Sequence, residues 1–171
     1  MKRLITTFVI AACAALAFSS CEILDPDKDF SGTPYGFWVV DKLVVDASLT
    51  INGNTTSTTN TTDFTSDYCR LNIDTSGLAS LWYNLDLGTG FILYDGSTNR
   101  ITFKGDGIHA GDDGKAIILL GIYDIELNGD NMVLRQPEAS LGGSTYGASQ
   151  KATYYLHRAP KKEKPKETTQ Q

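Results

Sequence analysis

From Tyr35 onward, apolar and polar residues alternate in short runs, and each run ends near glycine, asparagine or aspartate. Alternation with a period of two is the pattern of a β-strand that buries one face. The runs follow one another at the spacing of a β-sandwich or a β-barrel, and none has the period of an amphipathic helix. The body of the chain is therefore predicted to be an antiparallel all-β domain of about eight strands.

The first run, residues 36–49, changes the parity of its apolar positions partway along. Trp38 and Val40 fall on one parity, whereas Leu43 and Val45 fall on the other. One extra residue in a strand exchanges its inward and outward sets. A β-bulge or a sharp bend is therefore predicted near Asp41.

The same alternation places the later strands. It predicts strands at residues 64–73, 78–87, 91–94, 100–104, 116–127, 132–135 and 152–158. The inward residues expected in the first two are Cys69, Leu71, Ile73, Ala79, Leu81, Tyr83, Leu85 and Leu87. Glycine-rich segments at 105–114 and before residue 152 are expected to be loops. The Thr-rich residues 50–63 form either a mobile loop or the exposed ends of two long strands, and the tolerance of strands for threonine favours the second.

Local connections between these strands predict an up-and-down meander. Closing the meander into a barrel pairs the two strands that would otherwise be exposed edges. A barrel of about eight strands has an interior that side chains nearly fill, or that holds one small ligand. A β-sandwich is the alternative architecture.

Three short segments resemble a known family. Gly36-Phe37-Trp38 is similar to the Gly-Xaa-Trp signature that opens lipocalin barrels. Residues 123–134 look like the penultimate hairpin of small bacterial lipocalin-like lipoproteins, and residues 154–158 resemble their closing strand. The resemblance implies a lipocalin-like barrel over residues 35–160, in which Arg158 packs across Trp38 at the closed end.

A lipocalin-like barrel implies a small apolar or amphipathic ligand. The candidate residues that would line or floor its pocket are Trp38, Tyr83, Phe91, Phe103 and Tyr123. The alternative function is that of a structural or adhesive envelope protein, which binds a protein or a glycan through its outer surface. By parity, Trp82, Asn84 and Asp86 are the candidates for that surface.

The start of the chain has the features of an export signal. Lys2 and Arg3 precede the apolar residues 4–18, which are too few to span a bilayer and typical of a signal peptide. Residues 18–21, Phe-Ser-Ser-Cys, match the pattern that bacterial lipoprotein signal peptidase cleaves. We therefore expect residues 1–20 to be removed and Cys21 to be acylated. Several acyl chains would hold the protein firmly at a membrane. An ordinary signal cleaved near Ala17 is the alternative.

The flanking segments complete the expected organisation. Residues 21–34 form a lipidated acidic tether, and residues 161–171 form a Lys-rich tail expected to be disordered. The expected location is the cell envelope, with a lipid anchor in the outer membrane and the domain facing either the periplasm or the cell surface.

The charge balance and the cysteines exclude several classes of function. The net charge of −5 becomes −7 when Lys2 and Arg3 leave with the signal, which argues against nucleic-acid binding. Cys13 also leaves and Cys21 carries lipid, so Cys69 is expected to be a small buried side chain without a disulfide partner. We expect a monomer.

No motif in the sequence indicates catalysis. His109 and His157 have no carboxylate or histidine at ligand spacing, and both are expected to face solvent. The acidic loop with Asp106, Asp112 and Asp113 does not have the spacing of a calcium loop. We therefore expect neither an enzyme nor a bound metal or cofactor.

Overall fold

The computed structural model describes residues 30–112 and 115–160, and its compact unit extends from Phe30 to Ala159. The expected export signal, Cys21, most of the acidic tether and the Lys-rich tail lie outside these residues. Every regular element of the described chain is a β-strand. Within the same residues, no helical segment has the length and hydropathy needed to cross a bilayer.

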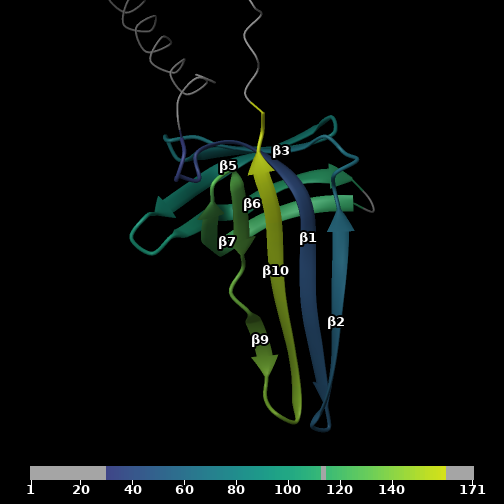
Figure 1. Ribbon diagram of the computed structural model, residues 1–171. Coiled ribbons are helices and arrows are strands. Elements are labelled where there is room, and N and C mark those ends of the chain that lie inside the picture. Colours follow the sequence, from purple (N-terminus) through teal and green to yellow (C-terminus); the bar gives the residue numbers. More distant parts are fainter. Residues whose placement is uncertain (1–29, 113–114, 161–171) are drawn as a thin grey trace, which may run out of the picture. The chain divides into compact units, whose positions relative to one another are not determined.

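Ten strands make up the described chain (Figure 1). They are β1 (Gly36–Ile51), β2 (Asn54–Asp63), β3 (Cys69–Ile73), β4 (Leu78–Tyr83), β5 (Asp86–Asp95), β6 (Arg100–Asp112), β7 (Lys115–Asn128), β8 (Asn131–Arg135), β9 (Ala139–Gly142) and β10 (Tyr146–Arg158). Eight of them, β1, β3 to β8 and β10, pair antiparallel in a meander, and β10 returns to pair with β1. The closed barrel confirms the predicted up-and-down architecture over the β-sandwich.

The predicted irregularity in β1 is present. The pairing of β1 with β10 shifts register between Val40 and Lys42, as a bulge at Asp41 requires. Trp38 and Val40 are buried before the bulge, and Leu43 packs against the core after it. The extra residue therefore keeps the apolar side of β1 facing the interior along the whole barrel.

The boundary between β4 and β5 differs from the prediction. The strand predicted at 78–87 ends at Tyr83, and Asn84 takes a left-handed conformation with φ of 53° in the turn that follows. The expectation that Leu85 and Leu87 face inward is wrong, since they are 102% and 51% exposed. After this turn, the residues that face inward no longer follow the alternation of β4. The apolar residues continue to alternate through the turn, so the sequence does not indicate where it lies.

The segment predicted as the loop 105–114 instead continues β6 as far as Asp112. Its backbone passes close to the inner side of β5, where a Cβ atom on Gly88 would lie 2.0 Å from the carbonyl oxygen of His109. Only glycine fits at such a close approach of two backbones. The large apolar side chains of this part of β5 therefore lie on the outer surface.

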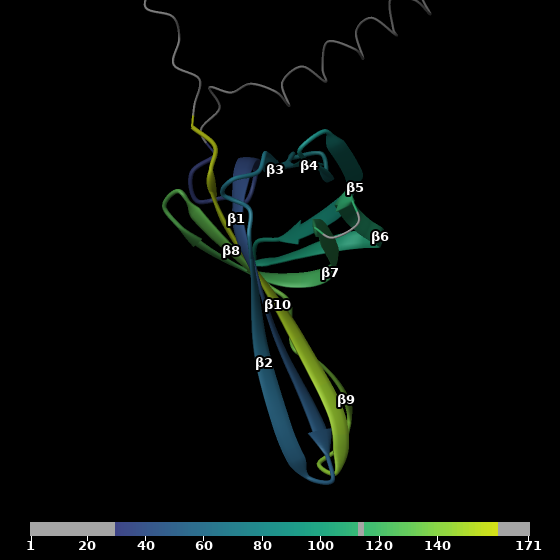
Figure 2. The ribbon, with the colours of Figure 1, turned by 90° about the vertical axis from the view of Figure 1, so that its right-hand side faces the viewer.

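Two further segments form strands that extend beyond the barrel. The Thr-rich β2 pairs with residues 42–51 of β1, which confirms the prediction of long exposed strand ends. The Gly/Ser-rich segment expected as a loop forms β9 and the first part of β10. We call β2, β9, residues 42–51 of β1 and residues 146–151 of β10 the arm (Figure 2).

Arg158 closes one end of the barrel against Trp38. Its Cζ atom lies 4.3 Å from the centre of the indole ring, and the indole Nε1 donates a 2.8 Å hydrogen bond to the carbonyl of Pro34. The guanidinium donates to the carbonyls of Tyr35 at 2.9 Å, Thr33 at 2.8 Å and Phe30 at 2.5 Å. The Arg158 side chain thus fixes residues 30–35, which precede β1, because its planar guanidinium group donates to several carbonyls at once.

We predict that Arg158→Lys lowers the free energy of unfolding by about 2–3 kcal/mol, since an ammonium cannot reach the same carbonyls together. Chemical denaturation of the purified protein measures the change. Arg135→Lys is the matched control, because Arg135 makes an exposed ion pair with Glu126 and should lose less than about 1 kcal/mol. Equal losses in the two variants would show that Arg158 does not hold the closed end.

Candidate functional site

Four of the five predicted pocket residues lie inside the barrel. Trp38, Phe103 and Tyr123 are at most 2% exposed, and Tyr83 is 6% exposed. Phe91 is 70% exposed, so the prediction that it lines the interior is wrong. It pairs with Leu78 on the outer surface, because the inward positions before it on β5 hold glycine.

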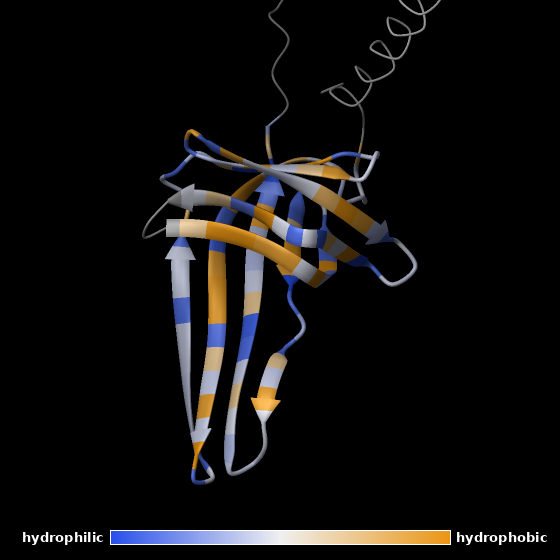
Figure 3. Ribbon diagram, turned by 180° about the vertical axis from the view of Figure 1, so that it is seen from behind, coloured by the Kyte–Doolittle hydropathy of each residue, from blue (hydrophilic) through white to orange (hydrophobic). Residues whose placement is uncertain are grey.

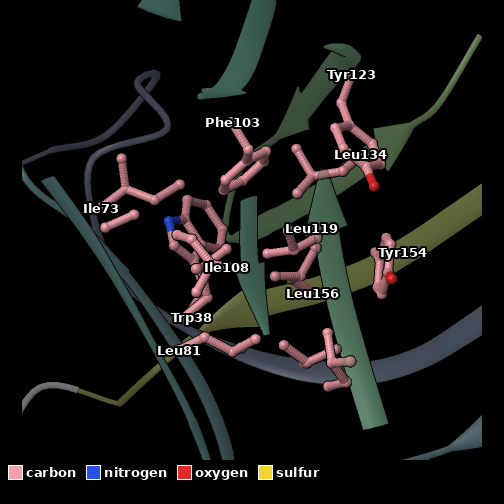
Figure 4. Close-up of a cluster of buried hydrophobic side chains, with 14 of the residues drawn as sticks. Trp38, Ile73, Leu81, Phe103, Ile108, Leu119, Tyr123, Leu134, Tyr154 and Leu156 are labelled. Carbon is pink, nitrogen blue, oxygen red and sulfur yellow. The ribbon is translucent and has the colours of Figure 1, made fainter. Parts of the chain in front are cut away.

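The buried aromatic rings contact one another. Phe103 meets Tyr123 edge to face with ring centres 5.6 Å apart, and Tyr123 meets Tyr154 at 6.1 Å. Tyr83 makes a similar contact with Phe64 at 5.9 Å. These rings belong to one contiguous cluster of buried side chains that occupies the barrel interior (Figure 4). Edge-to-face pairs of this kind are typical of a packed core.

Two tyrosine hydroxyls compensate for missing strand pairing beside β7. Only residues 124–128 of β7 pair with β8, which leaves the first part of β7 without that neighbour. The Tyr154 hydroxyl donates a 2.7 Å hydrogen bond to the carbonyl of Ile118. The backbone N–H of Leu120 donates to the Tyr123 hydroxyl at 3.4 Å.

Burial raises the pKa of both hydroxyls. For Tyr154, desolvation is the main cause of the raised pKa, the neighbouring Tyr123 adds to it, and the bond to Ile118 opposes it. For Tyr123, desolvation raises the pKa and the bond from Leu120 opposes the shift. Both groups therefore stay protonated at neutral pH and act as structural hydrogen-bonding groups.

The two histidines lie apart on the outer surface. His157 Nδ1 lies 2.8 Å from an oxygen of Asp41, the bulge residue, so the expectation of an imidazole that faces only solvent is wrong for His157. His109 is exposed on β6 opposite Ile118. Among the described side chains, no group of three or more His, Cys, Asp or Glu residues is placed to hold a metal ion. Cys69 is fully buried in the core.

The predicted surface site on β4 and β5 is mostly engaged in local structure. Trp82 is half-buried between Arg70 and Leu87 on the outer face of the sheet. The side-chain oxygen of Asn84 accepts a 3.2 Å hydrogen bond from the backbone of Tyr68. Asp86 accepts one of 2.8 Å from the backbone N–H of Gly111. These polar groups hold turns and strands together.

The arm carries the feature that the sequence did not reveal. The interior-facing pair Leu43–Tyr154 is followed along β1 and β10 by Val45–Ala152, Ala47–Gln150, Leu49–Ala148 and Ile51–Tyr146. Leu141 of β9 joins the same face beside Ala148. Beyond the barrel these side chains become exposed, to 52% for Leu49, 50% for Ile51, 81% for Leu141 and 62% for Tyr146. We call these four side chains the stripe. Figure 3 shows that the strands beyond the barrel carry hydrophobic segments, in orange, between more polar ones.

The opposite face of the arm is polar. Ser48 and Ser149 share a 2.9 Å hydroxyl hydrogen bond, and Thr50 and Thr55 share one of 2.8 Å. The Thr59 hydroxyl donates a 2.7 Å hydrogen bond to Asp46. The arm is therefore an amphipathic sheet whose apolar face continues the barrel core.

We predict that the stability difference between the wild type and Tyr154→Phe narrows above about pH 10. At neutral pH the variant loses about 1 kcal/mol with the bond to Ile118. A raised folded-state pKa stabilises the protein below the unfolded value, near 10, and this contribution is lost as pH rises toward the folded pKa. Phenylalanine cannot ionise, so the two curves converge.

Denaturant unfolding at pH 7 and at about pH 11 measures this convergence. Phe103→Leu is the control, since it weakens the same core without removing an ionisable group and should keep a constant difference. A difference for Tyr154→Phe that does not change with pH would contradict the raised pKa.

Comparison of the chain with protein-family models, curated proteins and solved structures found no match.

Proposed function

We propose that the chain is a lipid-anchored protein of the cell envelope that binds another protein through the stripe of its arm. The observation that carries this proposal is the continuation of the core-facing side of β1 and β10 beyond the barrel, where its apolar side chains are half or more exposed. Exposed apolar surface of this kind is a mark of interaction sites in soluble domains.

The chemistry of the stripe favours a protein partner over a glycan. Three of its four side chains, Leu49, Ile51 and Leu141, are aliphatic, and the fourth is Tyr146. Aliphatic surface gains free energy when it is buried against other apolar groups. A glycan offers mainly hydroxyl groups, whereas a protein surface offers matching aliphatic side chains.

The start of the described chain and the stripe lie toward opposite ends of β1. Phe30, where the described chain begins, is held by Arg158 at the closed end, beside the start of β1. Leu49 and Ile51 of the stripe lie near the other end of β1, in the part of the strand that pairs with β2. Figure 2 shows this part of β1 beside β2, beyond the barrel. Acylation of Cys21 would therefore tether the domain by its closed end and leave the arm available to a partner.

The expected affinity of one arm is low. Full burial of a leucine or isoleucine contributes about 1.5–3 kcal/mol, so burying the exposed half contributes roughly 1 kcal/mol for each stripe residue. The total, roughly 4 kcal/mol, only matches the lowest estimates of the entropy cost of association. A useful interface therefore needs additional contacts, or several arms that act together.

A photo-crosslinking residue in place of Leu141, in the full chain in intact bacterial cells, should form an adduct with one partner protein. Adding Leu49→Asp should reduce the adduct about tenfold, because a charge opposes burial of the stripe. Ser140→Asp, on the polar face of the same arm, is the control and should leave the adduct unchanged. An adduct insensitive to Leu49→Asp would rule out the stripe as the binding surface.

A small-ligand carrier of the lipocalin type is the second candidate function. The closed barrel and its apolar, aromatic interior support it, because ligand pockets have the same composition. The mutual ring contacts of Phe103, Tyr123 and Tyr154 favour a packed core instead. We therefore place the binding surface outside the barrel.

A further inference from the structure

In place of the monomer expected from the sequence, we propose that two copies of this chain pair edge to edge through β2, so that their arms form one antiparallel sheet. In the described chain, β2 is a terminal strand of the sheet and pairs with β1 alone. This pairing runs from Asn54 to Asp63 in unbroken register. The outer edge of β2 is therefore a straight template for another strand.

β2 lacks the sequence features that normally keep an edge strand from pairing with another chain. Residues 54–62 contain only threonine, asparagine and serine, with no proline, charge or bulge. The other terminal strand, β9, has only four residues, and shortness is itself a protection. β2 is therefore the edge best suited to pairing.

The distribution of charge favours a second copy as the occupant of this edge. Residues 30–160 contain 14 acidic and 8 basic side chains, and the arm holds only two of each. Within the arm, Lys42 lies opposite Asp63, and Asp46 lies opposite Lys151. Two barrels repel each other, whereas the neutral arms can approach.

Self-pairing of β2 is also free of like-charge contacts. In an antiparallel pair, Asp63 of each copy lies at the end of the strand where the other copy has Asn54. The centre of the pair, around Thr58, brings threonine opposite threonine, and such cross-strand pairs are favourable. The edge is thus complementary to itself, as a two-fold interface requires.

The pairing would double the interaction surface. A two-fold axis perpendicular to the sheet keeps the two stripes on the same face of the joined arms. Two weak sites held together bind a repeated or extended partner more tightly than one site alone. The pairing uses the edge of the arm and not the stripe, so it does not rest on the proposed function.

A cysteine scan of the full chain in intact cells tests the pairing. Thr56→Cys, Thr58→Cys and Asn60→Cys are made singly, in two co-expressed copies with different tags, and the cells are treated with a mild oxidant. Only a residue beside the two-fold axis faces its own counterpart within disulfide distance. We expect one of the three positions to give a strong dimer containing both tags.

Ser140→Cys on the β9 edge is the control and should give no dimer, as should the unsubstituted chain. Adding a lysine beside the crosslinking cysteine, at Thr58 for the Thr56 or Asn60 variant and at Thr56 for the Thr58 variant, places like charges near the axis and should reduce the dimer about tenfold, whereas Ser140→Lys should not. Absence of the dimer, or equal crosslinking at every position, would overturn the proposal. An adduct of β2 with a different protein would overturn it too, while leaving the function proposed for the stripe intact.

Discussion

The pairing of β1 with β10 is the contact on which the rest of the structure depends. It runs from Trp38 and Arg158 at the closed end to Ile51 and Tyr146 at the tip of the arm. Its first part closes the barrel, and its second part supports β2 and β9. The extra residue at Asp41 lets one strand serve both parts, because it restores the inward orientation of the apolar side chains after the bend.

Alternation predicted the architecture because each barrel strand buries one face. Cys69, Leu71 and Ile73 lie inward as their spacing indicates, and the parity change at Asp41 located the bulge. The same rule failed at Phe91, where the close approach of the β6 backbone requires glycine at Gly88. Parity identifies the two faces of a strand, but which face is inward depends on contacts far away in the sequence.

The arm illustrates the same limit for the candidate site. Leu49 and Ile51 continue the parity of Leu43 and Val45, so the sequence does not distinguish exposed residues from core residues. Only the structure shows that β1 and β10 continue beyond the other barrel strands, so that nothing in the described chain buries Leu49 and Ile51. The first part of β10 was also missed, because glycine, serine and alanine there carry little strand signal and the pairing with β1 decides the conformation.

We propose different roles for the two parts of the domain, with the barrel as a packed base and the arm as the interaction surface. Native mass spectrometry of the full chain, purified in a mild detergent, tests this division most directly. The expected result is a mass per chain equal to the covalent mass of the denatured protein. A reproducible extra mass that leaves on denaturation would contradict the packed interior and restore the ligand carrier.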